Sequence, residues 1–385
     1  VPHHWMLDWS TPFPLFVADA KGATLTDADG HTYDDFCLGD TGSMFGHSPE
    51  PVAKAIAAQA GHGLTYMLPT EDILAVGKLL ENMFGLPFWQ VTTTATDSNR
   101  FVIRWCRAIT KRTKVLVFHG AYHGAVPWCN PYPNGATAED RVHLIRYDYN
   151  DVASLERAAA EAGDDLAAVF VSAFKHDLGK THEAPTKAFA QAARGLCDRT
   201  AAALIVDDVR AGFRLNIGGS WEQVGVKPDL AAYSKAIANG YALGAVTGND
   251  RFRAAAGRIF VTGSFWYGAV SMAASIAAIE KMKSIGAIDI MQRMGQRLRD
   301  GIDGQAKSHG IKLHQSGPVQ MPVILFDDDA DRKKGWLFCT EALKRGVYMH
   351  ATHTMFLSAA HTAADIDRTL EATDLAMAEV ARQFG

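Results

Sequence analysis

The sequence predicts an α/β fold whose larger domain is built on a mainly parallel β-sheet. Four short, continuous apolar runs are typical of strands that such a sheet buries on both faces. These runs are Lys114–Phe118, Leu166–Ser172, Ala201–Val206 and Asp229–Tyr233. Helical patterns lie between them, at Asn150–Ala162 and Pro185–Arg199. Strands that alternate with helices indicate right-handed crossovers, and 385 residues leave room for a second, smaller domain.

The two ends of the chain predict that smaller α+β domain. The segments with helix or strand patterns in the C-terminal part are Ile288–Gly304, Val319–Phe326 and Thr362–Phe384. The last begins at Thr362 with Asp365 three residues later, which is close to a capping box. Near the N-terminus, Leu15–Asp40 has the pattern of a β-meander. We expect a smaller domain made from both chain ends, with the larger domain between them, so the boundaries are residues 1–50, 51–282 and 283–385.

Composition and charge argue against several classes of function. Hydrophobic residues make up 48% and charged residues 21% of the chain, as in ordinary globular proteins. The net charge of -4 argues against a nucleic-acid partner, and no apolar run is long enough to predict a membrane partner. Five dispersed cysteines contain no C-x-x-C pair, which argues against a zinc ribbon or a redox dithiol. Reduced thiols of this kind favour a cytoplasmic protein.

Polar features follow the predicted strands where a ligand would bind, outside the carboxyl ends of an open α/β sheet. They are Thr92–Asn99, His119–Gly124, Asp207-Asp208 and Ser234-Lys235. The first of these leads into a helix that we predict at Arg100–Ile109. Each has a simpler structural explanation: a helix cap, a plain turn, an N-cap carboxylate and a solvated surface lysine. Their occurrence together at one edge favours a site.

These residue types suit one kind of cofactor chemistry. A lysine amine can form an imine with an aldehyde, and a carboxylate can keep a pyridine nitrogen protonated. Backbone N–H groups at a helix N-terminus bind phosphate, and an aromatic side chain can stack on the ring. A metal pair at His119 and His123 is disfavoured, because Gly120 and Gly124 argue against the helix that would align them, and we expect no metal.

The motifs resemble those of class III (subgroup II) pyridoxal 5'-phosphate (PLP)-dependent aminotransferases, in the glutamate-1-semialdehyde aminomutase-like branch. Asp207–Arg214 is similar to the family's Asp-Glu-Val-x-x-Gly-Phe-Arg, and Gly120–Gly124 to its Gly-x-Tyr-His-Gly. Tyr233–Ala245 resembles Leu-Gly-Lys-x-x-Gly-Gly-Gly-x-Pro-x-Gly-Ala. The resemblance runs in order over nearly the whole chain. It implies PLP fold type I, with a seven-stranded, mainly parallel sheet in the larger domain.

The resemblance also implies site residues. Lys235 would hold PLP as a Schiff base and move the substrate proton, and Asp207 would pair with the pyridinium nitrogen. The further implied cofactor contacts are Ala95 and Thr96 on the phosphate, Val209 and Tyr122 on the ring faces, His123 beside them, and Ser264. Because Ser264 would reach the phosphate of a neighbouring subunit, we expect a homodimer with shared active sites. Trp5 and Trp266 are candidates for contact with substrate, although core packing is the default expectation for each.

The sequence departs from the family pattern in the phosphate loop. The family's Ser-Gly-Thr-Glu-Ala-Asn is replaced by Thr94-Ala-Thr-Asp-Ser-Asn99, so the backbone must tolerate a Cβ at Ala95. Asp208 is one methylene shorter than the usual Glu. Asn239 and Ala242 interrupt the Gly/Pro run after the lysine.

The first hypothesis for function is an aminotransferase. It would move an amino group from an amine or amino acid donor to a keto acid, ketone or aldehyde acceptor, with a substrate that is bulky or aromatic. An aminomutase or racemase that acts on a single amino acid is the alternative within the same cofactor chemistry. A PLP-binding protein without catalysis is a third hypothesis, which an intact Lys235 and Asp207 disfavour.

Overall fold

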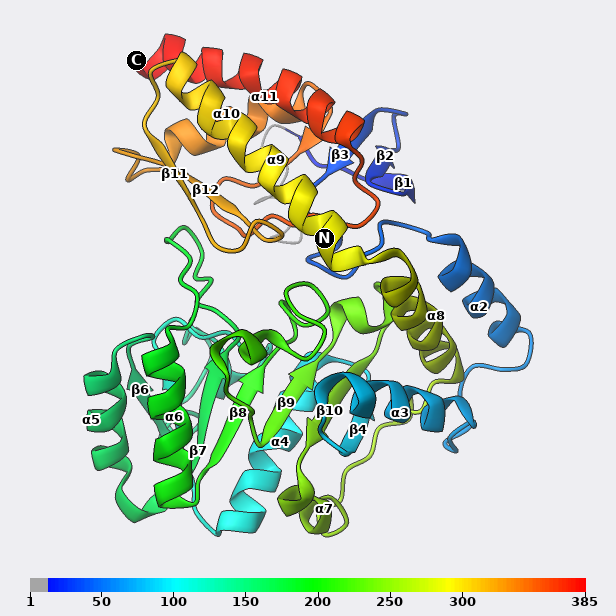
Figure 1. Ribbon diagram of the computed structural model, residues 1–385, viewed down its shortest axis with the longest axis vertical. Helices are drawn as coiled ribbons and strands as arrows, with labels where there is room; N and C mark the ends of the chain where they lie inside the picture. Colours follow the sequence, from blue (N-terminus) through cyan, green and yellow to red (C-terminus); the bar gives the residue numbers. More distant parts are fainter. Residues whose placement is uncertain (1–12) are drawn as a thin grey trace. The chain divides into compact units, whose positions relative to one another are not determined.

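The computed structural model describes residues 13–385, and the chain divides into two compact units (Figure 1). The smaller unit takes the chain up to Ala53, His176–Glu183 and Lys281–Gly385. The larger unit takes Lys54–Lys175 and Ala184–Glu280. No residue pattern predicted that His176–Glu183 belongs with the chain ends. Among the described residues, no helix has both the length and the apolar character to cross a bilayer.

The larger unit is built on a seven-stranded sheet in the order β4-β10-β9-β8-β7-β5-β6. Its strands are β4 (Phe88–Thr92), β5 (Lys114–Phe118), β6 (Leu144–Tyr147), β7 (Leu166–Ser172), β8 (Ala203–Asp207), β9 (Leu230–Tyr233) and β10 (Gly244–Gly248). Strand β10 runs antiparallel to both neighbours, and the other pairings are parallel. The four predicted strands are therefore confirmed. Strand β8 begins two residues late, because Ala201 adopts φ 55° and caps the preceding helix.

Helices cover both faces of this sheet (Figure 1). Helix α4 (Ala95–Thr110) packs on one face, where its Phe101 shares an apolar cluster with Ile205 of β8. Helices α5 (Val152–Ala162) and α6 (Lys187–Thr200) pack on the other face, where Phe189 meets Leu204. Successive side chains of β8 face opposite sides of the sheet, as the two-residue period of a strand requires. The remaining helical segments associated with this part of the chain are α2 (Glu50–Ala60), α3 (Asp72–Phe84), α7 (Asp250–Ala256), α8 (Ala269–Ile285) and the short turns η1 (Pro127–Cys129), η2 (Gly163–Asp165), η3 (Ser220–Val224) and η4 (Lys235–Ala238).

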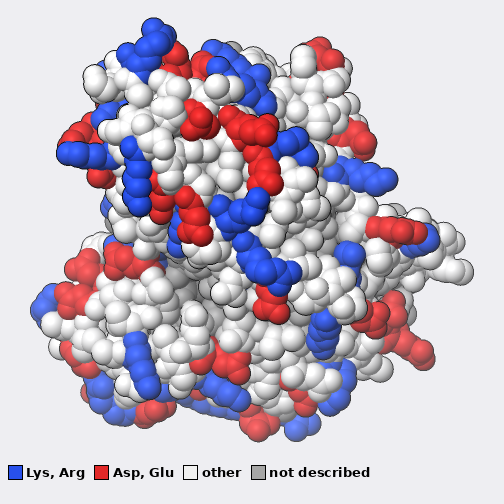
Figure 2. Space-filling view, turned by 45° about the horizontal axis from the view of Figure 1, so that its top comes forward, with Lys and Arg blue, Asp and Glu red and all other residues white. Residues whose placement is uncertain are grey.

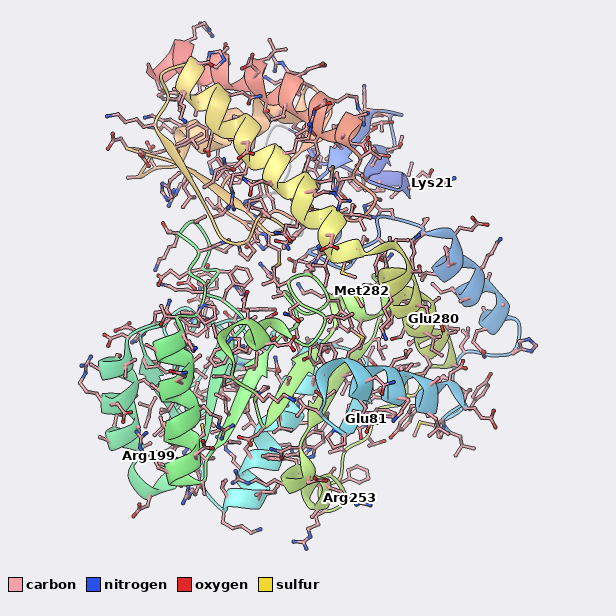
Figure 3. All side chains as sticks on the ribbon, viewed as in Figure 1. Lys21, Glu81, Arg199, Arg253, Glu280 and Met282 are labelled. Carbon is pink, nitrogen blue, oxygen red and sulfur yellow. The ribbon has the colours of Figure 1, made fainter. Side chains whose placement is uncertain are left out.

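Local side-chain bonds fix where helices begin. Thr94, Asp151 and Thr186 each accept a hydrogen bond from a backbone N–H three residues on, which satisfies a donor that the helix leaves open. Helix α4 is longer than the predicted Arg100–Ile109, because the N-cap at Thr94 lets Ala95–Asn99 form its first turns. Arg199, near the end of α6 (Figure 3), forms an ion pair with Glu156 of α5.

The smaller unit joins the two chain ends in one sheet of order β1-β2-β3-β13. Its elements are β1 (Val17–Lys21), β2 (Thr24–Asp27), β3 (Thr32–Asp35), β11 (Leu313–Ser316), β12 (Val323–Phe326), β13 (Val347–Tyr348), α9 (Ala287–Ser308), α10 (Lys333–Leu343) and α11 (Ala363–Phe384). The predicted meander is confirmed, and the capping box at Thr362 starts α11. The predicted strand from Val319 is shorter, because Met321 closes a turn onto Pro318 and Pro322 has no N–H.

Charged side chains are distributed without a large single-sign area on the face shown in Figure 2, where Lys and Arg lie among Asp and Glu. The chain as a whole carries 38 basic and 42 acidic residues, so neither sign has a large excess. On this face, recognition must therefore come from particular side chains rather than from a broad electrostatic field.

Candidate active site

Asp207 and Lys235 lie at one edge of the large sheet because adjacent parallel strands carry them. Asp207 is the last residue of β8 and pairs in register with Ala232 of β9. Lys235 follows the end of β9 by two residues and begins the short η4 turn. Its φ of 55° is in the left-handed region, which costs a non-glycine residue about 1 kcal/mol or more and is often found at functional sites. The predicted convergence of these two residues on one edge is thus realised in the fold.

Three donors converge on the Asp207 carboxylate. Its Oδ2 atom accepts hydrogen bonds from His123 Nδ1 at 2.8 Å and from Asn99 Nδ2 at 2.9 Å. Its Oδ1 atom accepts one from the Val209 amide at 3.1 Å. Two donors therefore occupy Oδ2, whereas Oδ1 keeps a lone pair for a further donor. Such a carboxylate is suited to receive the N–H of a protonated pyridine ring.

His123 supports this carboxylate from within an aromatic enclosure. Its ring stacks on Phe170 with centroids 4.0 Å apart and an interplanar angle of 4°, and the residue is 1% exposed. Its Nε2 atom has no hydrogen-bond partner in the described part of the chain. The segment that carries it is not helical, since Gly120 and Gly124 adopt φ of 84° and 133°. His123 therefore meets Asp207 and is not aligned with His119 on a helix face.

The N-terminus of α4 has the backbone donors that an anion site requires. Thr94 Oγ1 accepts from the Asp97 amide at 3.2 Å, so this donor is satisfied. The amides of Ala95 and Thr96 come before it, in the first turn, where the helix provides no partner. Uncapped amides at the positive end of a helix are a site for phosphate. Ala95 is not among the residues with positive φ, so alanine fits where the family pattern has glycine.

The loop after β5 packs tightly on this helix end. Thr96 Oγ1 accepts a hydrogen bond from the Ala125 amide at 3.2 Å. A Cβ built on Gly124 would lie 2.9 Å from Thr96 Oγ1 and 3.0 Å from Thr96 Cα. Glycine at residue 124 thus allows the loop that carries His123 to approach the first turn of α4 closely.

The other predicted site residues occupy different surroundings. Val209 is buried, whereas Tyr122 is 49% exposed beside His123. Ser264 is exposed, and its carbonyl accepts a hydrogen bond from Thr65 Oγ1 at 2.9 Å. Trp266 packs edge-to-face on Phe101, with centroids 4.8 Å apart, and is 7% exposed, so the structure gives it a packing role in the core. The predicted substrate contact of Trp5 lies outside the described residues.

The Asp208 side chain lies on the opposite face of the sheet from Asp207. Its carboxylate accepts hydrogen bonds from the amide and the hydroxyl of Ser220, which fix the start of η3. Burial raises the pKa of Asp208 to about 6, against the lowering effect of the Ser220 bonds. The two acidic residues therefore have separate tasks, although they are adjacent in the sequence.

Asn99 is a polar contact that the sequence analysis did not assign to the site. It lay in the motif that ends the threonine-rich stretch, and its side chain is 1% exposed. The available signal was its position four residues after Ala95, which places both residues on one face of a helix. Reading that signal required the helix to begin at Ala95, earlier than predicted.

Comparison with known proteins identifies the family. Residues 6–375 match the family described as aminotransferase class-III, and the chain belongs to it. The chain is 40% identical to an aminopentol aminotransferase of Sphingopyxis macrogoltabida, over 97% of this chain and 88% of that protein. It is 30% identical to a glutamate-1-semialdehyde 2,1-aminomutase of Rhodopirellula baltica, over 94% of this chain and 88% of the relative.

Among solved structures, the chain is similar to the PLP internal aldimine form of the FumI protein of Sphingopyxis sp. MTA144. The TM-score is 0.97 at 39% identity, and the match covers 100% of this chain and 93% of that one. The fold is thus PLP fold type I, and the protein is a PLP-dependent aminotransferase. The residues present fit the cofactor, because the first turn of α4 offers amides for a phosphate and Asp207 Oδ1 keeps a free lone pair.

Proposed function

We propose that Lys235 is the residue to which PLP attaches, and that the enzyme transfers the amino group of a bulky amine to a keto acid, ketone or aldehyde. The observation that carries the proposal is the placement of Lys235 and Asp207 at the ends of adjacent parallel strands, at one edge of the sheet. The relative named an aminopentol aminotransferase supports a bulky donor.

Each residue then has a defined task. The amides of Ala95 and Thr96 bind the phosphate, and Asp207 Oδ1 accepts the N–H of the cofactor ring. Bound PLP supplies an electron sink for the negative charge left at the substrate carbon. The freed Lys235 amine would take a proton from the donor carbon and deliver it to the cofactor carbon C4', which is general acid–base catalysis. Val209 and Tyr122 enclose the ring from its two faces.

The visible absorption of the purified protein tests this proposal. We expect a yellow protein whose band bleaches with an amine donor and recovers when a carbonyl acceptor is added. Aminopentol belongs in the donor panel, beside aromatic amines and simple amino acids. Lys235→Ala should lose the covalently held band and the activity. Lys78→Ala, which removes an exposed lysine paired with Glu81, should keep both. A colourless wild-type protein that takes up no PLP would contradict the proposal.

An aminomutase is the second candidate, because of the 30% identity to a glutamate-1-semialdehyde 2,1-aminomutase. The two activities differ in the number of substrates. An aminomutase converts one substrate that bears both groups and needs no separate acceptor. Incubation with glutamate 1-semialdehyde alone, followed by product analysis, distinguishes them: full turnover without an acceptor would favour the aminomutase.

The enzyme is further proposed to be a homodimer in which Ser264 reaches the phosphate in the neighbouring subunit. An exposed apolar surface near Ser264 supports this, since Thr65 bonds to Ser264 and large apolar side chains lie exposed along both segments. We call it the 64–68/260–265 surface, and its members are Leu64, Tyr66, Met67, Leu68, Phe260 and Phe265. Exposed apolar clusters of this kind are typical of protein interfaces. A cytoplasmic location remains a prediction, supported by free thiols at Cys37, Cys106, Cys197 and Cys339.

A further inference from the structure

The side-chain amide of Asn99 connects parts of the site that lie far apart in the sequence. Its Nδ2 atom donates to the His123 carbonyl at 2.8 Å and to Asp207 Oδ2 at 2.9 Å. The same Asp207 oxygen accepts from His123 Nδ1 at 2.8 Å. The Asn99 amide thus holds both the backbone carbonyl of His123 and the Asp207 carboxylate that bonds to the His123 ring. Because each neighbour of Nδ2 is an acceptor, the reversed amide would place three oxygens together, so the assignment of Nδ2 follows from the chemistry.

The position of Asn99 in α4 links this network to the phosphate site. Asn99 is four residues after Ala95, and residues at this spacing share a helix face about 6 Å apart along the axis. A single rigid helix therefore carries the amides of the anion site and, one turn later, the donor that fixes Asp207. The helix begins at the Thr94 cap, and Ser98 anchors it by a 2.8 Å hydrogen bond to Thr92 of β4.

These contacts set the orientation of the Asp207 carboxylate. Two donors bind its Oδ2 atom, and one of them, the Nδ2 group of Asn99, can act only as a donor. The carboxylate is thereby turned so that Oδ1, with one donor from Val209, is the oxygen with a free lone pair. The burial of Asn99 also favours a role in positioning the carboxylate. Asn99 is 1% exposed, and its Oδ1 atom has no partner among the described residues. A buried amide that leaves one polar atom unsatisfied costs free energy, which calls for a compensating function.

We propose that Asn99 is a positioning residue that orients the Asp207 carboxylate and His123 toward the ring nitrogen of PLP while α4 holds the phosphate. The inference rests on the proposed function, since it assumes that PLP occupies this site. It assigns Asn99 no contact with substrate. Asn99 acts through Asp207, so its loss should change the state of the cofactor more than the binding of the donor.

The test compares the holoenzyme of Asn99→Leu with the wild type. Leucine has nearly the shape of asparagine but cannot donate. We expect the pH midpoint of the visible band to move by about half a unit or more, because a hydrogen bond to the carboxylate is lost. Release of PLP into a competing apoprotein should be about tenfold faster, and kcat should fall about tenfold. KM for the donor should stay within about twofold, as expected for a group that does not bind substrate.

Val102→Ala is the matched control. Val102 is fully buried in the same helix and belongs to the apolar cluster on that face. Its truncation should lower the stability of the protein and leave the band, PLP release and kcat near wild type. Asn99→Leu with a wild-type midpoint, release rate and kcat would overturn the inference and leave Asn99 a packing residue.

Two further variants keep the test decisive if Asn99→Leu does not fold. Asn99→Ser leaves space and a small donor, so a partial effect is expected. Asn99→Asp keeps the shape but turns an acceptor toward Asp207 Oδ2, so the effect should exceed that of Asn99→Ser. An Asn99→Asp protein that behaves as wild type would overturn the inference. Failure of the proposed function is recognised separately, because the wild type itself would then lack the visible band.

Discussion

Asp207 and Asp208 are adjacent at the end of β8, yet their carboxylates lie on opposite faces of the sheet. Asp207 bonds to Asn99 on the face covered by α4. Asp208 bonds to Ser220 on the face where Trp221 packs with Val206. The two-residue period of a strand enforces this division, so one pair of acids can serve a cofactor and a structural loop at once.

Removal of the Asp207 charge should impair the chemistry. In Asp207→Asn the cofactor would lose the carboxylate proposed to pair with its ring nitrogen, and kcat should fall by about a hundredfold or more. Steady-state kinetics beside the visible spectrum measure this. Asp208→Asn is the internal comparison, since that residue lies on the other face. Equal losses in the two variants would contradict the separate roles.

Asp208 should make stability depend on pH. Burial raises its pKa to about 6 in the folded protein, against about 3.9 in an unfolded chain. Between these values the folded state binds the proton more tightly, so its contribution to stability is greatest below pH 4. That contribution is lost as pH rises through 6, by about 2–3 kcal/mol in total.

Urea denaturation at pH 4.5 and 7.5 tests this difference. Asp208→Asn should lack that part of the pH dependence, so it should lose less stability than the wild type between the two values. Asp198→Asn, at an exposed carboxylate of α6, is the control and should follow the wild type. The same pH dependence in wild type and Asp208→Asn would show that the Asp208 carboxyl is not responsible.

Loss of the N-cap of α4 should weaken cofactor binding as well as stability. Thr94→Ala removes the acceptor for the Asp97 amide, at a cost of about 1 kcal/mol. Because that helix end is the proposed phosphate site, PLP release should also become faster. Thr362→Ala removes the equivalent cap of α11 in the smaller unit. It should cost similar stability and leave PLP release unchanged; equal release rates in the two variants would count against the phosphate site.

A methyl group at residue 124 should separate the loop from α4. Gly124→Ala places a Cβ 2.9 Å from Thr96 Oγ1 and also strains a φ of 133°. Gly30→Ala strains a φ of 88° but meets nothing within 4 Å. Both variants should lose about 1 kcal/mol of stability from the backbone alone. Only Gly124→Ala should also lose PLP affinity, and unchanged affinity there would mean that the contact is not needed.

The proposed homodimer should depend on the 64–68/260–265 surface. Phe265, which is 69% exposed, is next to Ser264. Phe265→Asp should shift sedimentation toward the monomer, because a charge would be buried in the interface. Leu375→Asp changes a residue that is 56% exposed on α11 and should not alter the oligomer. A wild-type protein that sediments as a monomer at micromolar concentration would contradict the proposed dimer.

Parts of the fold were predictable because their signals are local. Strand β7 is seven residues long and buried throughout, and a continuous apolar run indicates such a strand directly. The capping box of α11 could also be predicted, since Thr362 and Asp365 are three residues apart. The start of α4 was missed because Thr96, Asp97, Ser98 and Asn99 have a weak helix propensity, which the Thr94 cap and the Ser98 bond to Thr92 of β4 overcome.

The sequence by itself determined four buried strands of the large sheet, the helices between them and the motif residues Asp207 and Lys235. Only the tertiary structure decided which side chains meet. Asn99 and Asp207 are 108 residues apart, and His123 and Asp207 are 84 residues apart. These contacts depend on the order of strands in the sheet and on the face that α4 covers. Long-range packing sets both of these features, whereas residue patterns report mainly the local conformation of the backbone.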